Sequence, residues 1–242
     1  MQIFSKILLS LSAGALLFAS CTKQTEEPKT DDYFPLEIGK YILYDVDSIT
    51  YDDHSRTTYH NNYQMRYEVV DTFRDNEGRL SYAIDVLQRV TSNDTFVGRD
   101  VIHVTHTGAR LEWTQTNAKI IKMVFPIGAS TPSWDGLTFV EPREPAMAEY
   151  NTSVFPWEFK YSKIGESFDP GNNYFEETVT VTGIDEKTNE PGDSVYADRN
   201  FYQEIYAKGY GMVFKERIYW VYNIEQDYKK GYQLIMRAVT QN

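Results

Sequence analysis

The clearest pattern in the sequence is an alternation of apolar and polar residues with a period of two. It runs through Tyr63–Val69, where apolar side chains occupy the odd positions and polar side chains the even ones. After the turn-forming residues Asp75–Gly78, a similar alternation returns in Leu80–Val86. Such a period places alternate side chains on opposite faces of a strand, so one face is buried and the other meets solvent. The two segments therefore predict a β-hairpin of long strands.

Further strand patterns follow along the chain, separated by short turns. They predict strands over residues 40–49, 101–107, 110–116, 119–125, 175–184, 196–208, 212–223 and 232–239. Gly209 and Gly211, on either side of Tyr210, predict a bulge or sharp bend, which a curved sheet requires. We therefore expect a mainly β fold with little helix beyond residues 1–20. Residues 33–242 should form a single domain, an antiparallel, strongly curved meander sheet that is half-barrel or barrel-like.

Residues 126–156 interrupt the strand pattern. This segment contains five prolines and two glycines. Because proline offers no N–H to a sheet, long strand pairing is excluded there. We expect an irregular Pro/Gly-rich excursion with one or two helical turns over residues 145–150, where a proline stands in the first turn.

Residues 1–20 have the layout of a secretory signal peptide. Lys6 is their only charged residue, and apolar or small residues run from Ile7 to Ala19. The strongly apolar part is shorter than the ~20 residues that a membrane-spanning helix needs. Residues 21–32 are polar and acidic after Cys21, and their composition predicts a disordered tether.

The segment Leu17–Cys21 resembles the lipobox of bacterial lipoproteins, whose cysteine sulfur is acylated and becomes the new N-terminus. Phe18 departs from the leucine that is usual there. The resemblance implies lipid attachment at Cys21 by several acyl chains, which is durable because each buried CH₂ contributes about 0.8 kcal/mol. Cys21 is the only cysteine, so a disulfide within one molecule is excluded. The alternative is a general secretory signal followed by a chance cysteine.

Composition and charge narrow the choice of partners. Aromatic residues make up 15% of the chain, with 19 tyrosines, and they are interleaved with Val, Ile and Thr, as is typical of sheets. Without residues 1–20 the net charge changes from −11 to −12. Such an acidic chain is unsuited to nucleic acid, where affinity comes chiefly from Lys and Arg. It is equally unsuited to adsorption on anionic lipid.

Three segments together resemble a group of uncharacterised Bacteroidota lipoproteins. They are Tyr33–Tyr41, Phe125–Gly128 with Ser133–Gly136, and Glu204–Val213. The group has no known biochemical activity, so the resemblance implies only a cellular location. That location is the cell envelope, with a lipid anchor in the outer membrane. Whether the domain faces the periplasm or the cell surface stays open.

The sequence contains few residues that suggest catalysis. His103 and His106 are three apart on a predicted strand and point to opposite faces, which disfavours a shared metal ion. The carboxylates of Asp45–Asp47 and Asp52–Asp53 lack the glycine and terminal glutamate of a calcium-binding hand. Nucleophile elbows and phosphate-binding glycine loops do not occur. We therefore expect no cofactor, no metal and no enzymatic activity, with a hydrolase as a lower-ranked alternative.

Two kinds of residue are candidates for surface roles. Trp134, in the Pro/Gly-rich excursion, and Trp157 could form an aromatic binding surface, or else close the end of the core. Asp47–Ile49 and Asp193–Val195 are similar to tripeptides that Bacteroidota O-glycosylate on exported proteins, which implies Ser48 and Ser194 as sites.

The leading functional hypothesis is a non-catalytic envelope module that binds a partner or contributes structurally. The partner, whether protein, glycan or lipid, is not specified by the sequence. The main alternative is a carrier that holds an apolar ligand or lipid inside the curved sheet, and glycan binding ranks below it.

Overall fold

In the part of the chain that the structure describes, the protein folds as one antiparallel sheet of twelve strands. The computed structural model describes residues 33–140, 157–171 and 173–242. Its strands are β1 (Tyr41–Asp52), β2 (Thr57–Arg74), β3 (Leu80–Arg89), β4 (Val97–His106), β5 (Arg110–Gln115), β6 (Ala118–Val124), β7 (Trp134–Asp135), β8 (Glu158–Phe168), β9 (Phe175–Thr188), β10 (Tyr196–Ala207), β11 (Gly211–Asn223) and β12 (Tyr228–Gln241). The sheet order is β6-β5-β4-β3-β2-β1-β12-β11-β10-β9-β8-β7, so β1 and β12 are the only neighbours that are not consecutive along these described ranges.

The expected mainly β, strongly curved meander is confirmed. The described ranges contain strands and turns without a helix. Within them there is accordingly no helix of the length and apolarity that crossing a membrane would require. The helical turns expected over 145–150, the signal at 1–20 and the tether at 21–32 with Cys21 lie outside the described residues.

Two of the long strands, β2 and β8, differ most from the prediction. β2 begins at Thr57, ahead of the alternating segment, because Thr57–Asn62 are largely exposed and pair along one edge only, with β1. β8 was missed because most of its side chains are exposed and its pairing with β9 is interrupted by two register shifts. Apolar and polar residues alternate with a period of two only where a strand buries one face, so the exposed parts of β2 and β8 lack this alternation.

Register shifts supply the curvature of the sheet. They interrupt the pairing of β1 with β12, β2 with β3, β3 with β4, β5 with β6, β8 with β9, and β10 with both of its neighbours. A bulge bends its strand and increases the local twist. The bend predicted at Gly209 and Gly211 proves to be the hairpin turn between β10 and β11, where both glycines have positive φ (+76° and +102°).

The two ends of the sheet meet through the segment around β7. The N–H of Ile121 in β6 donates to the carbonyl oxygen of Gly136 (2.9 Å), and the N–H of Gly136 donates to that of Trp157 (3.1 Å). The indole N–H of Trp134 also donates to the Ile121 oxygen (2.9 Å). Gly136 allows this approach, because a Cβ there would lie 2.0 Å from the Phe159 ring. The sheet is thereby nearly closed into a barrel.

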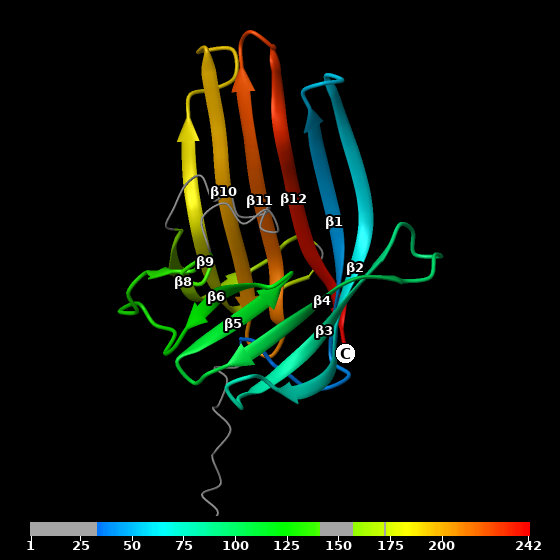
Figure 1. Cartoon of the computed structure of the whole chain (residues 1–242), viewed down its shortest axis with the longest axis vertical. Coiled ribbons are helices and arrows are strands. Elements are labelled where there is room, and N and C mark those ends of the chain that lie inside the picture. Colours follow the sequence, from blue (N-terminus) through cyan, green and yellow to red (C-terminus); the bar gives the residue numbers. More distant parts are fainter. Residues whose placement is uncertain (1–32, 141–156, 172) are drawn as a thin grey trace, which may run out of the picture.

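Closure is confined to one end of the molecule. β3 pairs with β2 only from Gln64 onward, and β8 pairs with β9 only up to Thr182. The remaining lengths of β2, β1, β12, β11, β10 and β9 continue as an open sheet, which fills the upper part of Figure 1. The shorter β3–β6 cross the lower part.

Candidate functional site

Side chains fill the interior of the closed part, and a buried ion pair crosses it. Lys122 in β6 and Glu204 in β10 are both buried, and Nζ lies 2.7 Å from Oε1. Because β6 and β10 are not neighbours in the sheet, this contact spans the interior. The hydroxyls of Tyr202 and Tyr206 donate to the two oxygens of the Glu204 carboxylate, at 2.5 and 2.6 Å. This level of the barrel is therefore occupied by a bonded network.

The network keeps Glu204 ionised. Burial alone would raise the pKa of Glu204, but the charges of Lys122 and Lys215 and the hydrogen bonds from Lys122 and Tyr202 outweigh it. The resulting pKa lies below the ordinary value of a glutamate. The Glu204 carboxylate is therefore charged at neutral pH, and its contact with Lys122 offsets the cost of its burial.

A second buried cation, Arg217 in β11, lies where the closed part gives way to the open sheet. One guanidinium nitrogen donates to Asn200 Oδ1 (2.8 Å) and to the carbonyl oxygens of Phe201 (3.0 Å) and Ile218 (2.5 Å). The guanidinium also lies 5.2 Å from the ring centroid of Trp157. Hydrogen bonds and ring contacts together hold this charge in place.

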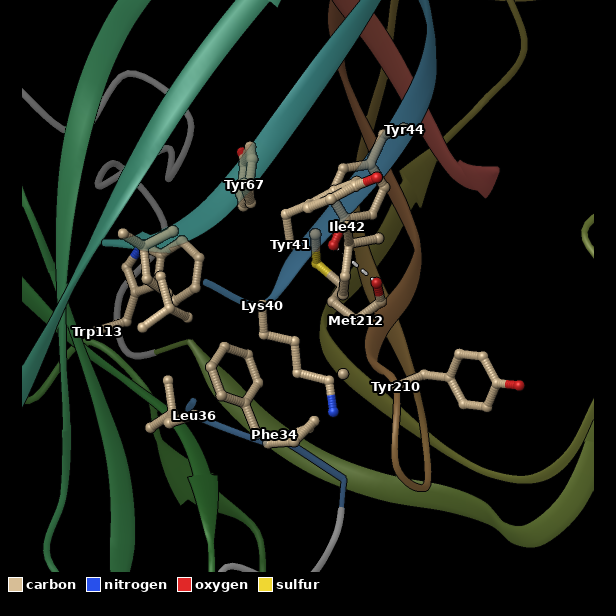
Figure 2. Close-up of a pocket in the computed structure, with 14 residues that line it drawn as sticks. Phe34, Leu36, Lys40, Tyr41, Ile42, Tyr44, Tyr67, Trp113, Tyr210 and Met212 are labelled. Carbon is tan, nitrogen blue, oxygen red and sulfur yellow. Dashed lines mark hydrogen bonds between the residues drawn. The ribbon is translucent and has the colours of Figure 1, made fainter. Parts of the chain in front are cut away.

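An apolar cleft opens at the lower end of the barrel, between the N-terminal segment of the domain and the β10–β11 turn. Figure 2 shows side chains from distant parts of the chain converging on it. Its main apolar walls are Phe34, Leu36, Ile42, Tyr67, Trp113 and Met212.

The walls of this apolar cleft are fixed by specific contacts. The Phe34 ring packs edge-on against Trp113 at a centroid distance of 6.2 Å. The Tyr44 hydroxyl donates to the carbonyl oxygen of Met212 at 2.8 Å (Figure 2). Burial raises the pKa of Tyr44 well above its ordinary value, so this hydroxyl stays a donor. The cleft is therefore largely preformed, as small-molecule sites usually are.

The apolar cleft has a cavity volume of ≈ 40 Å³. One water-sized sphere needs about 10–15 Å³, so this volume admits about three waters or the end of an alkyl chain. Lys40 is the only charged side chain among the lining residues within the described ranges, and its Nζ lies 3.4 Å from the carbonyl oxygen of Gly209. The site thus combines a short apolar recess with one cation at its rim.

The two tryptophans proposed as a binding surface lie at the closure of the barrel. Trp157 is 0% exposed and packs against Tyr202 at a centroid distance of 5.6 Å. Trp134 is partly exposed, stacks on Phe159 at 5.9 Å and donates its indole N–H to β6. The Trp134 ring connects β6 with β8, whereas the Trp157 ring is buried against Phe159 and Tyr202. The apolar cleft lies among other residues. A ligand-binding role for them stays a prediction.

The structure places the other predicted positions separately. Ser48 lies mid-strand in β1, paired with Asn61 and Leu234, and Ser194 lies in the β9–β10 connection, where it bridges Pro191. Both are partly exposed, and their glycosylation stays a prediction, as does acylation of Cys21.

The histidines and carboxylates considered for metal binding have other neighbours. His103 packs on Phe73 at 5.0 Å, and His106 packs on Phe125 at 4.7 Å. The carboxylates in and after β1 each have a separate partner. Asp45 accepts a hydrogen bond from Gln64, and Asp52 accepts hydrogen bonds from His54 and Ser55. Asp47 is paired with Arg237, and Asp53 with Lys230. The described ranges bring together no group of three or more His, Cys, Asp or Glu that could hold a metal ion.

Sequence reasoning missed the buried charges. Lys122 interrupts the apolar run Ile120–Met123, and Glu204 stands between Tyr202 and Tyr206 on the same face of its strand. Arg217 stands two residues before Tyr219. A charge at an inward position of a strand requires a partner. The charged residues at these inward-facing positions were visible in the sequence, but their positions do not identify the residues with which they pair.

The comparisons with known proteins add a limited likeness. No protein-family model matches the chain, and no curated protein matches it either. Among solved structures, a protein of Bacteroides fragilis described as exported and as having a YmcC-like fold is 12% identical, with a TM-score of 0.43, over 86% of this chain and 98% of its own. A protein of Parabacteroides distasonis described as a lipoprotein is 12% identical, with a TM-score of 0.45, over 87% and 98%. Likeness at this level says nothing about activity.

Proposed function

We propose that this protein is a lipid-anchored, non-catalytic binding module of the cell envelope. Its anchor would be the acylated Cys21 in the outer membrane, on the periplasmic face or the cell surface. Its ligand would be an apolar chain with an acidic end, inserted into the apolar cleft. The observation that carries the proposal is the cleft itself: a preformed apolar recess whose single charged lining residue among those described is Lys40.

The filled interior favours this site over a carrier that encloses its ligand inside the sheet. Lys122, Glu204, Tyr202 and Tyr206 occupy the closed part and bond to one another. An enclosed lipid would have to displace a charged network whose partners would then be buried alone, at a cost of several kcal/mol. A ligand at the end of the barrel disturbs none of these bonds.

Hexanoate, a short acid-tipped alkyl chain, is a suitable probe. We expect the mature chain to bind it with chemical-shift changes at Trp113 and Met212. Leu36→Trp, which fills the apolar cleft, should weaken binding about tenfold or more, because a blocked pocket loses its apolar contacts.

The matched control is Ile38→Trp, two residues away, where the side chain is 62% exposed and outside the cleft lining. It should bind hexanoate like the unaltered chain. Absence of hexanoate binding, or equal binding by both variants, would overturn the proposed site.

A further inference from the structure

A second cleft lies on the other side of the β10–β11 turn, and its lining is polar. It measures ≈ 360 Å³, within the range of small-molecule sites. It shares Ile42 and Tyr210 with the apolar cleft and is otherwise lined by Val213 of β11, the start of β9, the loop before β9 and the end of β12. In Figure 2 the Tyr210 ring points away from the apolar cleft. This turn therefore separates two recesses of different chemistry.

The polar cleft forms where β12 runs beyond its partner. β11 pairs with β12 only as far as Phe214 opposite Arg237, whereas β12 continues to Gln241. The Asn173 amide takes the place of a strand partner, with its Nδ2 donating to the carbonyl oxygens of Ala238 (3.0 Å) and Val239 (2.8 Å). Both amide hydrogens are thereby used, and Oδ1 is held in a fixed orientation as an acceptor.

Gln241 supplies a second acceptor. Its Oε1 is buried and receives no hydrogen bond from the residues that the structure describes. A buried acceptor without a donor costs about 1–3 kcal/mol, so such atoms usually meet a ligand or water. Because Gln241 lines the polar cleft, a rotation of its side chain on ligand binding would bring this oxygen to a ligand hydroxyl.

Two tyrosine rings flank these acceptors. Tyr174, in the loop before β9, is 66% exposed, and Tyr210 is 43% exposed. The Tyr210 ring is held edge-on against Phe175 at a centroid distance of 5.2 Å. Exposed aromatic faces beside fixed hydrogen-bonding groups suit a ligand with both apolar C–H faces and hydroxyl groups.

The lining also indicates the charge of the ligand. Among the described residues of the polar cleft there is no Asp, Glu, Lys or Arg, so an ionic ligand would find no counter-charge. From these features we infer that the polar cleft binds a neutral saccharide, stacked on Tyr174 or Tyr210 and donating hydroxyl hydrogen bonds to Asn173 and Gln241.

A glycan array with neutral and uronic-acid oligosaccharides tests the inference, with the mature chain in detergent as the analyte. Neutral glycans should bind, and Tyr174→Ser should weaken them about tenfold, as expected for loss of an aromatic contact. Tyr196→Ser, which removes an exposed tyrosine outside the cleft lining, should bind like the unaltered chain.

Gln241→Met separates binding from folding. It replaces an acceptor that lacks a donor by an apolar group of similar length, so the melting temperature should stay the same or rise while neutral glycan binding falls.

Hexanoate binding should be unchanged in Tyr174→Ser, because Tyr174 lies outside the apolar cleft. Hexanoate binding without glycan binding would therefore contradict the saccharide site and leave the apolar cleft as proposed. Binding of uronic-acid glycans alone, no glycan binding, or neutral binding indifferent to both Tyr174→Ser and Gln241→Met would overturn the inference.

Discussion

At the residue scale, the main feature of the fold is charge buried inside a β barrel. The Lys122–Glu204 pair connects strands that are distant in the sheet, and Arg217 is buried against aromatic rings. The apolar alternation of β6, β10 and β11 is visible in the sequence, whereas the pairing of charges across the barrel is not. That pairing depends on which strands face each other, which requires the closed sheet.

Glu204→Gln should destabilise the protein by about 3–5 kcal/mol, because the variant leaves the charge of Lys122 buried without its carboxylate. Urea unfolding followed by tryptophan fluorescence measures the change. Glu225→Gln, at an exposed turn, is the control and should stay within about 0.5 kcal/mol of the unaltered chain. A similar small change for Glu204→Gln would show that the pair contributes little.

Acid should destabilise the fold through Glu204 and Glu112. For Glu112 too, burial alone would raise the pKa. The hydrogen bonds from Arg110 and Lys119 and the charges of Lys119 and Arg79 outweigh burial, so the pKa of Glu112 lies below its ordinary value. Since both folded pKa values lie below the ordinary 4.5, their stabilisation is present above that pH and is lost as pH falls through the folded values.

Thermal melts in steps from neutral pH to about pH 3 would detect this loss as a falling melting temperature. The slope should be shallower in Glu204→Gln, which has one fewer group to protonate. If the melting temperature of the variant fell with pH as steeply as that of the unaltered chain, Glu204 would not contribute to the acid destabilisation.

Lys40→Met tests the cation at the rim of the apolar cleft. It should weaken hexanoate binding about two- to fivefold, the range of an exposed ion pair, and leave hexanol binding unchanged. Titrations of both compounds by nuclear magnetic resonance give the two affinities. Equal losses for the acid and the alcohol would assign Lys40 a packing role only.

At the scale of elements, alternation predicted the strands that bury one face and missed those that do not. β3, β5 and β6 were found within a few residues of their true ends, whereas β8 was missed and β2 was predicted too short. The Pro/Gly-rich segment was expected to be irregular, and its described part contains only the two-residue β7. That Trp134–Gly136 closes the barrel could not be predicted, because closure depends on contacts between the two ends of the sheet.

Gly136→Ala tests this closure. Its Cβ would meet the Phe159 ring at 2.0 Å, so the variant should lose about 1–3 kcal/mol or more in urea unfolding, as overpacked cores do. Gly98→Ala is the matched control, since no atom lies within 4 Å of its added Cβ. Equal stability of the two variants would contradict the tight approach of β7 to β8.

At the scale of the whole molecule, the sequence predicted a curved meander and its approximate limits. It did not predict that only one end closes while six strands continue as an open sheet. Nor did it predict the apolar cleft, whose walls Phe34, Trp113 and Met212 come from three distant segments. Such convergence follows from the order of the strands and cannot be read from local pattern.

The intact mass of the protein purified from its native membrane tests the lipid anchor at Cys21 directly. The chain should begin at Cys21, carry the added mass of several acyl chains and fractionate with the outer membrane. Cys21→Ser should lose both the added mass and the membrane association. An unmodified thiol at Cys21, or a native N-terminus at any other residue, would contradict a lipid-anchored module.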